Sequence, residues 1–543
     1  MVQVVQGKDL QAKAVDQWTR ELPIIAKRGD ITDCNGVTLV SSAGTYSVYG
    51  RIRSISDKSS TAKIISQVLD MDEDFLLKKF NSKVSEVTIK VNCTKEEIQK
   101  LKEYSLEGIY FSVCNKRVYP FNNSLCQILG YTTNDGSGQS GIEAYYDKYL
   151  KGINGEILYE SDLVGVDIGG KEPYYLSATD GLNLELTVDY EIQSVCDAVM
   201  DEAIARYSPK SASVIVINPN NGEILGISTK PDFSLNEVPR DDLESLNKLS
   251  RSVLIVDSYE PGSTFKIITS AINVEEYLNG NPKAFSTSHI FSSSRFRYVG
   301  GTKIKCWSTH ANGKHSNENL SDALNNSCNP IFVDIALSLG KNTFYDYLNK
   351  FNFGCVTGVD YSGEAIGMVV PEGAVTDNDL VRIGFGQTIA VTPIQLVSAV
   401  GSVVNGGKYY TPHLVKRVYS GDEKISESFI PKVKGSTVSK KTSEIINGYL
   451  ESVVTNGSGK NAYIEGYKVA GKTGTAQKYE NGFIAQGKYV MSFIGYFPSD
   501  SPEYLALVIV DEPVGGTYGS TVAAPLCKDV FQKIIELKNI KPC

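Results

Sequence analysis

The chain has 543 residues, more than one hydrophobic core can organise, so roughly two to four domains are expected. Its 41% hydrophobic and 21% charged residues are typical of folded protein and exclude a disordered or membrane-embedded chain. The net charge of -8, without a concentrated basic stretch, argues against nucleic acid as a partner. No run of about 18 apolar residues occurs, so no transmembrane helix is predicted.

Residues 1–178 are predicted to form a first domain of short strands and amphipathic helices. Apolar side chains recur every three or four residues over 59–80 and 94–104, the period of a helix with one buried face. Residues 45–49 alternate between polar and apolar side chains, as a half-buried strand does.

Residues 179–543 are predicted to form a second domain built on one sheet. The expected strands are 184–188, 213–218, 224–228, 488–496 and 504–511, and helices are expected over 190–206 and 524–537. The turn at 219–222 joins two of these strands into a hairpin. A sheet with strands from both ends of the region, and helices between them in sequence, predicts one α/β domain.

A first candidate catalytic motif is the Pro-Gly-Ser-Thr-Phe-Lys segment at 261–266, which stands before an apolar run. It predicts the start of a helix, with Ser263 in the first turn and Lys266 one turn later on the same face. A serine hydroxyl attacks only when a base takes its proton, and a lysine with a lowered pKa can be that base. The spacing alone is a weak signal because it recurs elsewhere, as at Ser60 and Lys63.

A second motif, Ser327-Cys328-Asn329, falls between two helical stretches. Ser327 can relay a proton to a leaving group, and Asn329 can hold a substrate amide. Like the first motif, the Ser-x-Asn spacing is weak alone, because it recurs in the chain.

A third motif, Lys472-Thr473-Gly474-Thr475, occurs once and continues a strand-like segment. Lys472 can bind a carboxylate or tune the serines, and the hydroxyls of Thr473 and Thr475 can bind a substrate carboxylate. Gly474 removes a side chain where a substrate backbone would approach.

The order of the three motifs makes the combination strong. Ser327 lies 64 residues after Ser263, and Lys472 lies 145 residues after Ser327. Ser-x-x-Lys, a Ser-x-Asn type motif and Lys-Thr-Gly form the set found in β-lactamases and penicillin-binding proteins. The sequence therefore predicts acyl transfer through a nucleophilic serine.

A possible metal site lies beside these motifs, at Cys306, His310, His315 and Cys328. Two thiolates and two imidazoles are the ligands of a tetrahedral zinc site. Their spacing is not that of a standard zinc finger, so a Cys306–Cys328 disulfide and unrelated packed thiols stay open. If zinc binds, we expect a structural role that orders the Ser327 loop, with a carboxylate able to replace His310.

On these motifs the chain resembles the class B penicillin-binding proteins over nearly its whole length, and within them the division and sporulation subgroup. Further matching stretches are Arg28–Ile31, Arg117–Pro120, Gly141–Glu143, Asn218–Glu223, Gly384–Thr388, Val391–Pro393, Gly495–Pro498, Tyr518–Gly519 and Ala523–Pro525. The resemblance implies a multidomain α+β fold, with an N-terminal pedestal or dimerisation-type domain over 1–178. A transpeptidase domain over 179–543 would have a central antiparallel sheet flanked by helices, as in serine β-lactamases. Cys34 departs from the pattern, where the family has arginine.

The resemblance also implies a serine D,D-transpeptidase that cross-links peptidoglycan stem peptides ending in D-Ala-D-Ala. Ser263 would attack the penultimate D-Ala carbonyl, with Lys266 as general base and Ser327 and Lys472 shuttling protons. The backbone N–H groups of Ser263 and Thr475 would form the oxyanion hole. β-Lactams would acylate the same serine, and no cofactor is expected for catalysis.

The family further implies septal or spore cell-wall synthesis at the extracytoplasmic face of the cell membrane. A membrane anchor is expected for the family and is absent from this chain. No transglycosylase region is recognisable, so a glycosyltransferase partner is expected.

Two other functions compete with this interpretation. A serine β-lactamase shares the motifs, but such enzymes are generally single domains of about half this length. A non-catalytic antibiotic sensor or cell-wall scaffold would not need the complete set of motif side chains.

Overall fold

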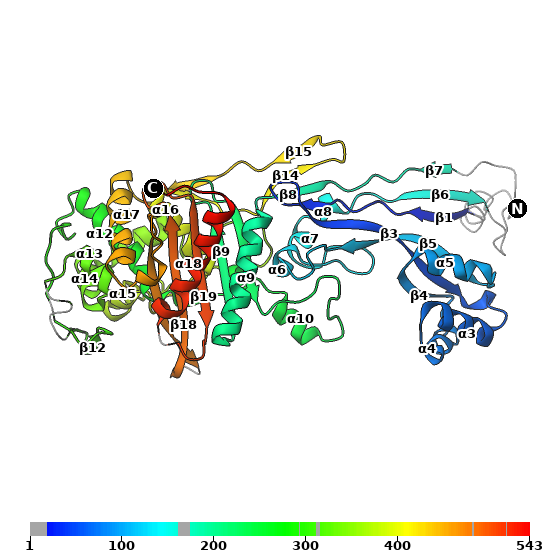
Figure 1. The fold of residues 1–543 in the computed structure, drawn as a ribbon, viewed down its shortest axis with the longest axis horizontal. Helices are drawn as coiled ribbons and strands as arrows, with labels where there is room; N and C mark the ends of the chain where they lie inside the picture. Colours follow the sequence, from blue (N-terminus) through cyan, green and yellow to red (C-terminus); the bar gives the residue numbers. More distant parts are fainter. Residues whose placement is uncertain are drawn as a thin grey trace, which may run out of the picture.

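The computed structural model describes residues 19–160, 174–292, 294–310, 315, 317–480, 483–516 and 518–542. The molecule is elongated, with a broad lobe at one end and a narrower arm that divides into two branches toward the N-terminus (Figure 1). The lobe carries the three motifs, so its sheet and helices decide the geometry of the candidate site.

The lobe is built on a five-stranded antiparallel sheet in the order β10-β9-β19-β18-β17. Its strands are β9 (Ser211–Ile217), β10 (Ile224–Lys230), β17 (Ala470–Glu480), β18 (Phe483–Phe497) and β19 (Tyr504–Asp511). β9 of the first hairpin pairs with β19 from the far end of the chain, with Val214 opposite Val508. The predicted central antiparallel sheet made from both ends of the domain is therefore confirmed.

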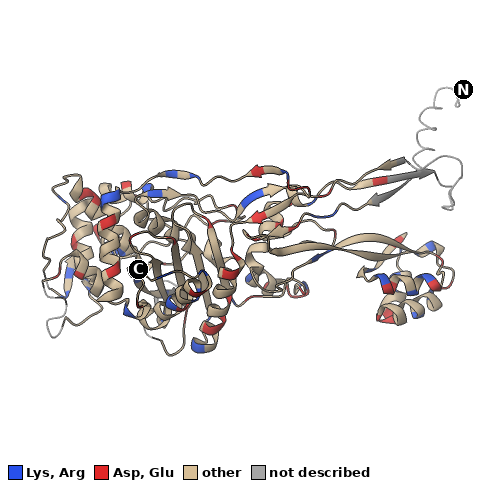
Figure 2. Ribbon diagram, turned by 45° about the horizontal axis from the view of Figure 1, so that its top comes forward, with Lys and Arg blue, Asp and Glu red and all other residues tan. Residues whose placement is uncertain are grey.

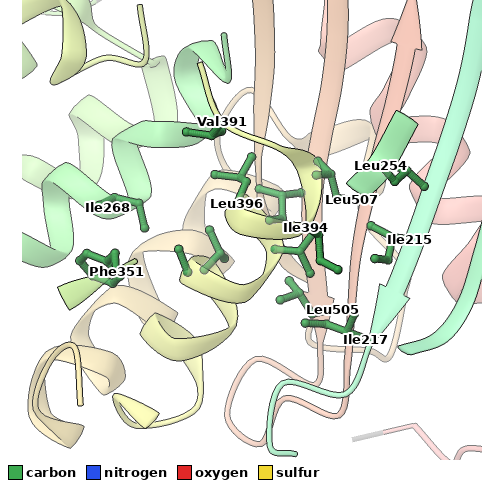
Figure 3. Packing of buried hydrophobic residues seen from close by; sticks show 14 of the residues in the cluster. Ile215, Ile217, Leu254, Ile268, Phe351, Val391, Ile394, Leu396, Leu505 and Leu507 are labelled. Atoms are coloured by element: carbon green, nitrogen blue, oxygen red, sulfur yellow. The ribbon is translucent and has the colours of Figure 1, made fainter. Parts of the chain in front are cut away.

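Helices cover both faces of this sheet. α9 (Tyr190–Tyr207) and α18 (Gly519–Leu537) pack on one face. On the other face lies α16 (Pro393–Val404), whose residues are all buried. Figure 3 shows Ile394 and Leu396 of α16 between the strand residue Leu507 and Ile268. A helix that is buried on all sides is a core helix, and this one joins the sheet to the helix that follows the serine motif.

The lobe contains further helices and short strands. They are α10 (Leu243–Leu249), α11 (Val253–Val256), η2 (Gly262–Phe265), α12 (Lys266–Leu278), β11 (Phe296–Val299), β12 (Thr302–Lys305), α13 (Leu320–Asn326), α14 (Asn329–Lys350), α15 (Asp377–Ile383), β13 (Lys408–Tyr410), β16 (Val433–Ser436), α17 (Lys440–Thr455) and η3 (Lys460–Ala462).

A second sheet runs from the lobe into the arm, in the order β15-β14-β8-β2-β3-β4, with β5 also paired to β3. Its strands are β2 (Ile31–Thr32), β3 (Thr38–Arg51), β4 (Glu86–Cys93), β5 (Ile109–Val118), β8 (Asn183–Leu186), β14 (Val415–Tyr419) and β15 (Ile425–Ser428). β8 pairs with β14 of the lobe and with β2 of the arm, so one hydrogen-bonded sheet joins the two parts. We keep the domain division at 178/179, just before β8, as a proposal.

The rest of the arm contains a smaller sheet, a helical cluster on β3 and, near the lobe, further short helices (Figure 1). The sheet is formed by β1 (Thr19–Ile24), β6 (Gly155–Glu160) and β7 (Tyr174–Leu176), and the other elements are η1 (Ile52–Ser54), α3 (Lys58–Leu69), α4 (Glu73–Phe80), α5 (Lys95–Glu103), α6 (Cys126–Leu129), α7 (Gly141–Tyr145) and α8 (Asp147–Leu150). The single helix predicted over 59–80 is wrong, because Asp70 adopts a left-handed conformation (φ 51°) that ends α3. Asp72 then caps a new helix.

Charged residues of both signs are interspersed along lobe and arm (Figure 2). Within the described part of the chain, no helix is long and apolar enough to cross a membrane.

A buried ion-pair network holds the inner arm together. Arg28 Nε lies 2.6 Å from Glu143 Oε2, and Arg117 Nη2 lies 2.7 Å from Glu143 Oε1. Arg28 Nη1 also lies 2.6 Å from Asp147 Oδ1. Glu143 is fully buried, so the two arginines must replace the hydration that its charged carboxylate would have in water. Three of the matching sequence stretches thus meet at one carboxylate.

Glu143→Gln should destabilise the arm strongly, because it leaves two buried guanidinium groups with one carboxylate fewer. We expect the free energy of unfolding to fall by about 3 kcal/mol or more, measured by urea titration. The matched control Glu86→Gln removes an exposed partner of Arg51, 3.9 Å away, and should cost about 1 kcal/mol or less. Equal losses in the two variants would contradict this account.

Candidate active site

The three motifs converge on one cleft of about 1010 Å³. Ser263, Ser327, Asn329, Thr473 and Thr475 all line it. The two motif lysines lie beside it and are fully buried. Sequence segments more than 200 residues apart are therefore brought together by α12, the α13–α14 junction and β17.

The serine turn is held by a close backbone contact. Ser263 is half-buried in the short helix η2, which leads into α12 at Lys266. Gly262 has a φ of 56° and donates its N–H to Gly386 O at 2.9 Å. A Cβ on Gly386 would lie 2.0 Å from Gly262 O, so only glycine allows this approach. The Gly384–Thr388 stretch, matched in the sequence without a role, supports the serine turn from behind.

The Lys266 amine is surrounded by the second motif. It donates to Ser327 O at 2.9 Å, to Ser327 Oγ at 3.1 Å and to Asn329 Oδ1 at 2.6 Å. Burial lowers the pKa of Lys266 to about 8, because a charged amine loses its hydration there. An amine in this pKa range can accept and return a proton near neutral pH.

Ser327 owes its orientation to a helix junction. It ends α13 in a left-handed conformation (φ 54°), and Cys328 is the N-cap residue before α14. This turn places the Ser327 hydroxyl and Asn329 on the cleft side, while Cys328 is buried at 2% exposure.

Lys472 lies on β17 at the sheet edge of the cleft. Its amine donates to Thr473 O at 3.3 Å, and its pKa is lowered by burial and by repulsion from Lys266. A Cβ on Gly474 would lie 2.3 Å from Ser492 Oγ, so the glycine is required for packing as well as for access. Thr475 Oγ1 accepts from the Gly519 N–H at 3.0 Å, which ties the strand to α18.

The four candidate metal ligands also come together. Their ligand atoms all lie within 4.8 Å of one another, and Cys306, His315 and Cys328 are buried. Cys306 Sγ lies 3.9 Å from His315 Nδ1, and Cys328 Sγ lies 3.8 Å from His310 Nε2. Both cysteines are free thiols in the structure, not a disulfide. Two sulfurs and two nitrogens gathered this closely are the donor set of a tetrahedral zinc site.

A carboxylate that the sequence reasoning left unnamed lies next to this cluster. Glu318 Oε1 is 3.8 Å from His315 Nδ1 and accepts from Asn326 Nδ2 at 2.6 Å. Glu318 is buried, and its Oε2 has no hydrogen-bond partner among the described residues. In the sequence, only its position three residues after His315 indicated that Glu318 could lie near the cluster.

Two aromatic residues of the cleft were missed as site residues. Trp307 and Tyr518 line the cleft with ring centroids 6.0 Å apart, at 56% and 50% exposure. The Trp307 Nε1–H donates to Asn326 O at 3.0 Å, which fixes the ring beside the second motif. In the sequence, Trp307 was marked only by its position next to Cys306. That position did not predict whether the ring would face the cleft or the Cys/His cluster.

Comparison with known proteins gives two family matches. Residues 212–534 match the penicillin binding protein transpeptidase domain, and residues 23–186 match the penicillin-binding protein dimerisation domain. The first match covers more than half of the chain and contains all three motifs.

The relatives agree with these matches. The chain is 36% identical to "Stage V sporulation protein D" of Bacillus subtilis (strain 168), over 100% of this chain and 83% of the relative. It is 27% identical to a "Peptidoglycan D,D-transpeptidase FtsI homolog" of Mesostigma viride, over 100% of this chain and 93% of the relative. A crystal structure of a peptidoglycan synthetase from Bifidobacterium adolescentis ATCC 15703 has the same fold, with a TM-score of 0.76 at 22% identity, covering 97% of this chain and 98% of that chain. The chain therefore belongs to the class B penicillin-binding proteins, a family of transpeptidase enzymes, and within it resembles the stage V sporulation protein D type.

Proposed function

We propose that this protein is a serine D,D-transpeptidase that cross-links peptidoglycan stem peptides through an acyl-enzyme at Ser263. The observation that carries the proposal is the fully buried Lys266 amine, 3.1 Å from Ser327 Oγ, at the cleft that Ser263 lines. A nucleophile, a base with a lowered pKa and a second hydroxyl for proton relay then share one site.

In the acylation step Lys266 takes the proton of Ser263 Oγ, and the oxygen bonds to the penultimate D-Ala carbonyl carbon. The C–N bond to the terminal D-Ala breaks, and its amine receives the proton through Ser327. The N–H groups of Ser263 and Thr475 stabilise the oxyanion, and Lys472 with Thr473 and Thr475 binds the terminal carboxylate.

In the second step the amine of a neighbouring stem peptide attacks the ester carbonyl. A new amide forms, the ester C–O bond breaks, and the amine proton returns through Lys266 to Ser263 Oγ. A β-lactam would open on Ser263 in the same way and keep its leaving group attached, so the acyl-enzyme would persist.

We further place this activity in septal or spore cell-wall synthesis at the extracytoplasmic face of the cell membrane, beside a glycosyltransferase partner. Support comes from the 36% identity to a relative named a sporulation protein and from the arm, which offers a surface separate from the cleft. The arm also favours a transpeptidase over a single-domain β-lactamase.

Ser263→Ala should abolish covalent labelling by a fluorescent penicillin, because no other side chain of the cleft replaces the nucleophile. The wild-type protein should gain the mass of one antibiotic and keep it for many minutes. Rapid turnover of the antibiotic would instead indicate a β-lactamase, and no adduct on the wild type would favour a non-catalytic scaffold.

Lys266→Gln should slow penicillin acylation by about 10³-fold, because general-base catalysis contributes about 10²–10⁴-fold. The matched control is Lys63→Gln, since Lys63 follows Ser60 at the same spacing but is exposed in the arm. Its acylation rate should stay at the wild-type value. A small effect of Lys266→Gln in stopped-flow measurements would assign the base to another group.

We also propose that Cys306, His310, His315 and Cys328 hold a structural zinc ion. The support is the donor set of two thiols and two imidazoles within 4.8 Å, mostly buried, at the end of β12 and the start of α14. Bound there, the ion would join these two segments and order the Ser327 turn. Ser263 supplies the nucleophile, so zinc would have no task in activating water.

Purified protein should contain about one zinc per chain, measured by elemental mass spectrometry. A strong chelator should lower the melting temperature by several degrees while the thiols stay reduced. Cys306→Ser should lose the metal, whereas the matched control Cys355→Ser, at an exposed cysteine, should retain it. Metal-free wild-type protein with unchanged stability, or a Cys306–Cys328 disulfide, would refute the zinc site.

A further inference from the structure

The strands β11 and β12 form a two-stranded ribbon at the rim of the active-site cleft. Phe296 pairs with Lys305, and Tyr298 pairs with Lys303. Because side chains alternate between the two sides of a strand, these four share one side of the ribbon. All four are exposed, at 36% for Phe296 and 64% for Tyr298. Neither the acyl chemistry nor the proposed zinc site uses them.

The four side chains form an aromatic and cationic surface. The Phe296 and Tyr298 rings are 5.5 Å apart and nearly perpendicular. Lys303 Nζ lies 3.9 Å from the centroid of Phe296 and 5.6 Å from that of Tyr298. In the described part of the chain, neither Lys303 nor Lys305 forms an ion pair. On a protein with a net charge of -8, two unpaired cations at a cleft form a local site for an anion.

The opposite side of the ribbon is fixed to the catalytic lobe. Arg297 makes a two-pronged ion pair with Asp334 of α14, at 2.7 and 2.6 Å, and Ile304 is buried. At the end of β12, Lys305 O accepts from the Asn329 side-chain N–H at 3.4 Å. The exposed surface is therefore held in a defined position next to a motif residue, as a binding surface must be.

We propose that this ribbon surface, Phe296, Tyr298, Lys303 and Lys305, binds the anionic, sugar-bearing part of a peptidoglycan strand beyond its D-Ala-D-Ala end. The proposal rests on the transpeptidase function proposed above. The two lysines would pair with stem-peptide carboxylates, and the two rings would lie against the apolar faces of sugar rings. Contacts far from the reacting carbonyl supply binding energy that positions it at the nucleophile.

The position of the ribbon favours a peptidoglycan strand over a lipid surface. Lys303, Ile304 and Lys305 line the cleft itself, so a substrate held at Ser263 continues directly onto the ribbon. β12 lies at the end of the molecule opposite β1 and the arm (Figure 1). A long substrate leaving the cleft on this side would lie along the ribbon.

The test measures binding without turnover, on a Ser263→Ala background. The probes are a soluble disaccharide pentapeptide ending in D-Ala-D-Ala and the same pentapeptide without sugars. Combining Tyr298→Ala with Lys303→Glu should raise the Kd for the disaccharide pentapeptide about tenfold, measured by calorimetry. The sugar-free peptide should lose less affinity, and Lys303→Arg alone should bind as the parent protein does.

The matched control combines Tyr104→Ala with Lys63→Glu, an exposed tyrosine and lysine of the arm, and should leave both Kd values unchanged. A melting temperature equal to that of the parent protein excludes unfolding as the cause. An unchanged Kd for the disaccharide pentapeptide would overturn the proposal, as would an equal loss for both peptides. Weaker sedimentation with phosphatidylglycerol vesicles but unchanged glycopeptide binding would assign the ribbon to lipid instead. Penicillin labelling of wild-type Ser263 is read separately, so failure of the transpeptidase proposal is distinguishable from failure of the ribbon.

Discussion

The burial of two lysine amines in one cleft is the constraint on which the rest of the site depends. Lys266 and Lys472 are both fully buried, and the positive charge of Lys266 lowers the pKa of Lys472 further. Removing an amine from water is costly unless acceptors replace the lost hydration. The Ser327 carbonyl and Asn329 Oδ1 provide those acceptors for Lys266. The second motif is thus needed to keep the base in place as well as to relay a proton.

The fold meets this constraint by making the supporting backbone rigid. α16 is buried along its whole length and packs against both the sheet and α12. The serine turn is hydrogen-bonded to Gly386 through the Gly262 N–H. β17 is hydrogen-bonded to α18 between Thr475 Oγ1 and the Gly519 N–H. The last two contacts require glycine at 386 and 519, because a Cβ at either position would collide with backbone. Precise placement of the motif side chains therefore rests on residues that carry no reactive group.

The sequence predicted the motif side chains better than it predicted the backbone contacts and helix bounds that position them. Motif order and spacing predicted one site for the serine and the two lysines, whose catalytic roles stay predictions. Strand patterns at both ends of the domain predicted the sheet. The start of α18 was predicted at residue 524, whereas the helix begins at Gly519 and contains Pro525. The division between α3 and α4 was missed because it depends on one left-handed aspartate in an otherwise periodic segment. The function of Gly386 was not readable either, since it depends on a contact with Gly262 more than 100 residues away in sequence.

The ribbon, the Cys/His cluster and the second motif form one continuous segment beside the cleft. β12 ends at Lys305, Cys306 follows at once, and Trp307 donates to Asn326 at the start of the Ser327 turn. Lys305 O accepts a hydrogen bond from the Asn329 side chain, and Asn329 in turn accepts one from the Lys266 amine. A shift of the ribbon would therefore change the position of a residue that orients Lys266. A zinc ion joining Cys306 to Cys328 would stiffen this path. Binding of a distant part of the substrate and orientation of the general base would then depend on the same few residues. A structural metal ion beside the active site, without contact to the reacting atoms, would hold these residues in place.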